Sequence, residues 1–146
     1  MKQSVLPTST GAQLQINSVD GDLQVIGWDR NEIVAKSDDD DLQLSMAGQN
    51  IQAVCDGDLI VYMHRDTGLK IHSVGGDAEL RALPGSSIEI YDVGGDLQIR
   101  DVMKADLKNI GGDLSVRDCY GDLTAVSVGG DASLHHIFGN VKISVG

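Results

Sequence analysis

Apolar and polar residues alternate along most of the chain, in short segments that begin at a glycine or an aspartate. The C-terminal part repeats this most regularly, as GGDLSVRDC, YGDLTAVSV, GGDASLHHI and FGNVKISVG, with glycines every nine residues at Gly112, Gly121, Gly130 and Gly139. Alternation with a period of two predicts strands with one buried face. Strands this short bury that face by stacking on similar units. No window between glycines has the i, i+3, i+4, i+7 spacing of a helix.

When each segment is numbered from its turn residue, two interleaved rows appear with a period of about 18 residues. Positions 3 and 5 are apolar in almost every segment, and an apolar residue at position 8 is expected to fill the corner. The first row begins at Gly21, Asp40, Gly57, Gly76, Gly95, Gly112 and Gly130. The second row begins at Ala12, Asn31, Gln49, Thr67, Ser86, Ala105, Gly121 and Gly139.

These rows predict an all-β protein that is a single β-solenoid (parallel β-helix) with about 18 residues per coil and roughly eight coils. The domain spans residues 1–146, and residues 1–10 form an N-terminal lead-in. Two-faced and three-faced coils both fit the pattern, and right-handed winding is favoured by analogy with crossover connections. The segment at Ala105 is expected to be irregular, because the polar Asn109 occupies its position 5.

Composition narrows the functional classes. The chain has 146 residues, 41% of them hydrophobic but only 3% aromatic, which indicates one domain with a narrow aliphatic core. A net charge of −11 argues against nucleic-acid partners and against an anionic membrane surface. Apolar runs are short, so neither membrane insertion nor a signal peptide is predicted.

No residue pattern predicts an enzyme. The chain has no G-x-S-x-G segment, no phosphate-binding loop and no histidine or cysteine at metal-binding spacing. Cys55 and Cys119 are expected to be small core residues, because three coils of about 4.8 Å separate them and a disulfide needs Cα atoms within about 7 Å. The aromatic residues are not expected to share a column, so no stacking platform for sugars or bases is predicted.

The strongest chemical candidate is position 2 of the first row, which is aspartate in all seven segments: Asp22, Asp41, Asp58, Asp77, Asp96, Asp113 and Asp131. One interpretation is that each carboxylate accepts a local backbone N–H bond after its glycine, which is itself expected to have a positive φ. The other interpretation is a cation-binding edge, and calcium is the cofactor that it would hold. Its ligands would be Asp20, Asp22, Asp39, Asp41, Asp56 and Asp58.

The blocks VGGDLQIRDV, IGGDLSVRDC and SVGGDASLHH, preceded by VDGDLQVIGWDRNEIVAK, resemble the bacterial "putative adhesin" family of β-strand-repeat domains. The resemblance covers most of the chain and implies a non-enzymatic solenoid with no catalytic residues. It also implies a place at the cell envelope or surface, whereas a cytoplasmic place is expected if no signal peptide was removed. A second resemblance is to bactofilins, which are cytoskeletal β-helices that polymerise end to end.

The C-terminal unit suggests how such a protein would find partners. Gly139 to Gly146 stops inside a repeat without a polar or helical cap, and an uncapped end exposes unpaired backbone groups. Three hypotheses follow: a binding or structural module, a self-assembling protein joined through the solenoid ends at Val141 and Ile143, and a calcium-binding solenoid. The predicted partners are therefore other proteins or further copies of the chain.

Overall fold

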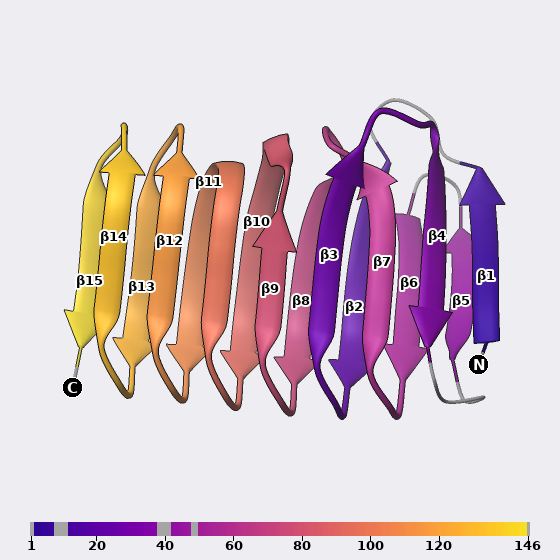
Figure 1. The fold of residues 1–146 in the computed structure, drawn as a ribbon, viewed down its shortest axis with the longest axis horizontal. Helices are drawn as coiled ribbons and strands as arrows, with labels where there is room; N and C mark the ends of the chain where they lie inside the picture. Colours follow the sequence, from indigo (N-terminus) through magenta and orange to yellow (C-terminus); the bar gives the residue numbers. More distant parts are fainter. Residues whose placement is uncertain (1, 8–11, 38–41, 48–49, 146) are drawn as a thin grey trace.

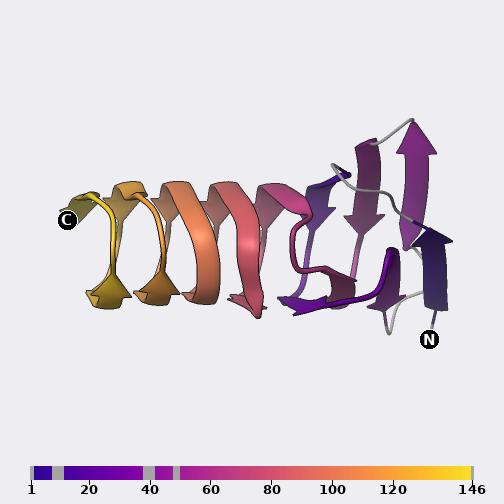
Figure 2. The ribbon, with the colours of Figure 1, turned by 90° about the horizontal axis from the view of Figure 1, so that it is seen from above.

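The computed structural model describes residues 2–7, 12–37, 42–47 and 50–145. Every regular element in these ranges is a strand, which confirms the predicted all-β class. The strands stand side by side in two rows that face each other along one long axis (Figure 1). Figure 2 shows the same two rows seen along the strands, with the N-terminal end broader than the C-terminal end.

Each row is a series of hydrogen-bonded neighbours. From the C-terminal end, the first row contains β14 (Ala132–Ile137), β12 (Leu114–Cys119), the first part of β11 (Leu97–Ile110), β9 (Ala78–Arg81), β3 (Leu23–Trp28), β7 (Leu59–His64), β4 (Glu32–Ser37) and β1 (Lys2–Pro7). The second row contains β15 (Val141–Val145), β13 (Leu123–Val128), the second part of β11, β10 (Leu83–Val93), β8 (Gly68–Val74), β2 (Gln13–Val19), β6 (Asn50–Cys55) and β5 (Gln43–Ala47).

The prediction of one parallel solenoid with roughly eight coils is not shown, because the pairing is mixed. The parallel strands, which pair with one another, are β2, β3 and β6 to β15. The strands β1, β4 and β5 pair antiparallel with their neighbours. The sequence pattern also placed β4 and β5 in the wrong rows, since β4 pairs with β7 and β5 with β6. Alternating burial is the same for both strand directions, so the pattern could not reveal the reversal.

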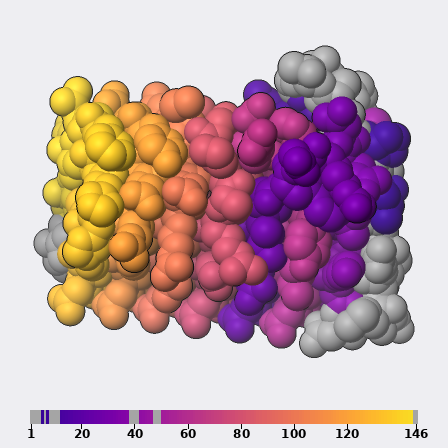
Figure 3. Space-filling model, turned by 45° about the horizontal axis from the view of Figure 1, so that its top comes forward, coloured from indigo at the N-terminus to yellow at the C-terminus, as the bar shows by residue number. Residues whose placement is uncertain are grey.

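The order of the coils also differs from the order of the chain. We call a second-row strand and the first-row strand that follows it a coil. The coil of β2 and β3 lies between the coil of β6 and β7 and the coil of β8 and β9. Figure 3 shows it as an indigo band between magenta ones. From β8 onward, the coils follow the chain.

The core lies between the two rows and is filled by the predicted inward positions. Positions 3 and 5 of β11 and β12, which are Leu97, Ile99, Leu114 and Val116, are at most 1% exposed. The corner position is buried as well, as Val102 shows at 0%. The expected irregularity at Ala105 is an error of register, because Ala105 and Leu107 themselves face the core and β11 is continuous there. Asn109 is exposed.

The turn glycines are explained by close approach of the backbone. Positive φ is absent from seven of them, so the prediction is wrong there: Gly21, Gly76, Gly95, Gly112, Gly121, Gly130 and Gly139. A β-carbon on Gly95 would instead collide with the Asp77 carboxylate, and one on Gly94 would lie 2.6 Å from the Gly75 carbonyl oxygen. Positive φ occurs at the opposite corner, in equivalent positions of successive coils: Ala82, Asp101, Asp118 and His136.

Candidate functional site

The aspartates of position 2 form a hydrogen-bonded ladder along one corner. The Oδ1 atom of each carboxylate before Asp131 accepts the backbone N–H of the aspartate in the neighbouring coil, at 2.8 to 2.9 Å. In spatial order the ladder is Asp58, Asp22, Asp77, Asp96, Asp113 and Asp131. The predicted N–H acceptance is therefore present, but it links successive coils, whereas the sequence suggested a local turn.

The predicted cation ligands lie partly at this corner. Asp20 and Asp22 stand beside Asp56 and Asp58, because the two turns pair through the Asp22 N–H to Asp58 Oδ1 bond of 2.8 Å. Asp39 and Asp41 lie outside the described residues. Among the residues that the structure places, no three histidine, cysteine, aspartate or glutamate side chains gather where they could hold a metal ion. Calcium binding stays a prediction.

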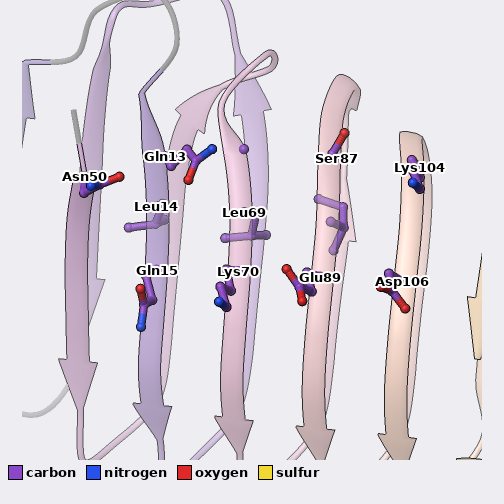
Figure 4. Close-up of a pocket in the computed structure, with 12 residues that line it drawn as sticks. Gln13, Leu14, Gln15, Asn50, Leu69, Lys70, Ser87, Glu89, Lys104 and Asp106 are labelled. Atoms are coloured by element: carbon purple, nitrogen blue, oxygen red, sulfur yellow. The ribbon is translucent and has the colours of Figure 1, made fainter. Parts of the chain in front are cut away.

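A hollow lies on the outer face of the second row (Figure 4). It is a shallow groove of about 390 Å³ that crosses β6, β2, β8, β10 and β11. Gly68 has no side chain to fill its middle, and Lys70 and Glu89 lie next to each other below it. The amide and charged groups of the groove could hydrogen-bond a polar ligand. No aromatic side chain lines it to provide stacking.

Aromatic side chains do share columns, contrary to the sequence-based expectation. Tyr120 and Phe138 stack at 5.8 Å between ring centroids, and Trp28 stacks on Tyr62 at 5.2 Å. Tyr120 and Phe138 are 47% and 68% exposed, and the carboxylates of Asp101 and Asp118 raise the pKa of Tyr120, Asp101 most strongly. Their separation of 18 residues equals the repeat period, so the sequence held the signal for this pair.

The C-terminal end, which consists of β14 and β15, is the most distinctive surface of the molecule. Among the described strands, β14 pairs only with β12 and β15 only with β13, so each leaves one edge open within this part of the chain. In these two strands the inward-facing side chains are no longer covered by a further strand. Leu123 is fully buried, but Val141 in the same column is 47% exposed. The same change from buried to half-buried occurs at Ala132, Leu134, Ile137 and Ile143.

The cysteines and one exposed histidine are the remaining titratable side chains of interest in the described part of the chain. Cys55 and Cys119 are free and fully buried, as predicted, and burial raises the pKa of Cys119. His136 Nδ1 lies 3.1 Å from Asp118 Oδ1, at an exposed position. In the described part of the chain, no helix is long and apolar enough to cross a membrane.

Comparison with known proteins gives little beyond the fold class. No protein-family model matches the sequence, and no curated protein is similar enough in sequence to count as a relative. A crystal structure from Clostridium sporogenes, described as a "putative cell adhesion protein", is similar over 99% of both chains, with 10% identity and a TM-score of 0.39. This likeness is too weak to assign the chain a family or a role, and the resemblance to the "putative adhesin" family stays a prediction. The location at the cell envelope or surface stays a prediction.

Proposed function

We propose that the protein is a non-enzymatic structural module of the β-solenoid type, which associates with other protein chains through its C-terminal end. One observation carries this proposal: both strands at that end have an open edge, and the apolar columns behind them are only half covered. An open edge presents unpaired N–H and C=O groups that another strand can bind.

Covering this end is favourable for a second reason. Val141, Leu134 and Ile137 occupy columns whose members one coil earlier are fully buried. Full burial of an aliphatic side chain contributes about 1.5–3 kcal/mol relative to an exposed one. Several half-exposed side chains that become buried together supply the kind of apolar centre that stable interfaces have.

The absence of a reactive cluster supports a non-enzymatic role. The described residues hold no group of three metal-ligating side chains, and the groove across β8 is shallow with polar walls. Catalytic sites usually combine an enclosed apolar pocket with a few converging polar groups.

Light-scattering mass after size-exclusion chromatography, measured over a series of protein concentrations, tests the proposal. We expect masses above the 15.5 kDa of one chain at high concentration. Replacing Val141 and Ile143 with aspartate should return the protein to one chain. Val126→Asp is the matched control, because Val126 is 53% exposed on the outside of β13 and away from the open edges.

A constant mass of 15.5 kDa at every concentration would refute self-association through this end. Loss of association in the Val126→Asp control, with an unchanged β-type circular dichroism spectrum, would show that the interface lies elsewhere.

A further inference from the structure

The open edges of β14 and β15 lie at different positions along the long axis of the molecule. Figure 1 shows the strands of the two rows alternating along the axis, with β15 beyond β14. One coil advances by one strand spacing of about 4.8 Å, so β15 lies about half that distance further out. Any partner that covers both edges must follow this step.

The two edges also run in opposite directions. Figure 1 shows β14 pointing up and β15 pointing down. A two-fold axis parallel to the strands keeps each strand direction and exchanges the two rows. It therefore brings β14 of one copy against β15 of the other in an antiparallel pair, and it does so twice with equal gaps.

A two-fold axis perpendicular to the sheets does not follow the step. It would bring β15 against the partner's β15, and leave the two β14 strands about one strand spacing too far apart to bond. Only the axis along the strands satisfies both edges. Stacking head to tail is disfavoured because Figure 2 shows a broader N-terminal end, and because β5 there is antiparallel to its own row.

We propose that a second copy of this chain covers the C-terminal end about a two-fold axis parallel to the strands, and so forms a closed dimer in which β14 pairs antiparallel with the partner's β15. This rests on the proposed function and adds the partner and the geometry. Inward residues must oppose inward residues in a pair. The axis keeps each residue at its height along the strands, and Ile137 and Val141 flank the same turn, so Ile137 lies level with the partner's Val141. Leu134 then faces the partner's Ile143, and on the outer face His135 faces the partner's Lys142.

Charge fits a second copy at this place. All 22 aspartate and glutamate residues precede residue 132, so the segment 132–146 carries no acidic side chain. Its ionisable side chains are His135, His136 and Lys142. The net charge of −11 opposes contact between copies over the rest of the surface, but much less at this end. The register also places Lys142 opposite the partner's His135 and away from the partner's Lys142.

A cysteine cross-link between His135 and Lys142 tests the pairing. Both side chains lie on the outer faces of opposite rows, so the double variant His135→Cys and Lys142→Cys cannot close a bond within one chain. Under mild oxidation of the full chain, we expect a covalent dimer from this variant and none from either single variant. The native Cys55 and Cys119 are fully buried and should not react in the folded protein.

The matched control is Arg117→Cys with Thr124→Cys, which lies in the same two columns one coil inward. It should give no covalent dimer. A dimer from His135→Cys alone or Lys142→Cys alone would overturn the proposed axis, because each requires like strands to pair.

The remaining outcomes separate the two proposals. A mass above that of two chains would overturn the closed dimer but not association through this end. The same holds if the aspartate variant of Val141 and Ile143 abolishes association but the cysteine variant never forms the cross-link. A protein that stays one chain at every concentration would overturn both.

Discussion

Replacement of one ladder aspartate should separate its hydrogen bond from its charge. Asp96 accepts the Asp113 N–H through Oδ1 at 2.8 Å, and its own N–H binds Asp77 Oδ1 at 2.9 Å. Asp96→Asn keeps an acceptor at this place and removes the charge. Asp96→Ala removes both.

The structure sets the expected changes in the free energy of unfolding. Unit charges one strand spacing of about 4.8 Å apart repel by about 0.9 kcal/mol in water, and Asp96 has two such neighbours. An exposed hydrogen bond to a carboxylate contributes about 1 kcal/mol, and a neutral acceptor about half of that. We therefore expect Asp96→Asn to raise the free energy of unfolding by about 1 kcal/mol at low salt, and Asp96→Ala to lie about 0.5–1 kcal/mol below Asp96→Asn.

Urea unfolding followed by circular dichroism, at low salt and at 1 M salt, is the assay. The gain from Asp96→Asn should shrink at high salt, where the Debye length falls to about 3 Å, whereas the gap between the two variants should persist. Asp92→Asn removes the same charge at an exposed site outside the ladder and controls for net charge. Equal stability of the asparagine and alanine variants would refute the hydrogen-bond ladder. A salt-independent loss in Asp96→Asn would refute the repulsion.

Three further results are expected. Ala82→Gly should raise the urea midpoint of unfolding, because a φ of 59° costs a residue with a β-carbon about 1 kcal/mol. The control Ala78→Gly, at a buried strand position, should lower the midpoint, and a lower midpoint for Ala82→Gly would contradict the reasoning. Burial raises the pKa of Cys119, so the thiol ionises at a lower pH in the unfolded chain than in the folded one, and the free energy of unfolding should fall as the pH rises above the ordinary thiol pKa. Cys119→Ala should lack this pH dependence in urea titrations. Millimolar calcium should change the thermal midpoint no more than magnesium does, and a calcium-specific rise would instead support the cation edge at Asp22 and Asp58.

The inward positions could be predicted because burial alternates in any strand with one covered face. The burial of Leu97 and Ile99 could be predicted without knowing the strand direction, and so could the column of aspartates. The reversals of β4 and β5 could not be predicted for the same reason, since an antiparallel strand carries the same alternation.

The candidate sites could be predicted from the sequence only in part. The period placed Asp77 and Asp96 in one column, but it could not tell a bond within a turn from a bond between coils, because both use the same carboxylate and an N–H close to it. The open edges at Val141 and Ile143 followed from the repeat. The groove at Gly68 depends on which strands are neighbours, and the displaced coil of β2 and β3 concealed that.

The displaced coil has a consequence for how the chain folds. Ladder bonds between later coils join residues 17 to 19 positions apart, whereas Asp22 bonds residues 36 and 55 positions away. Contacts between distant residues require larger loops to close and slow folding. On the ribosome, β2 and β3 emerge early but gain both neighbours only after residue 81 has been made. The later coils can add one after another, so their assembly should precede the insertion of the first one.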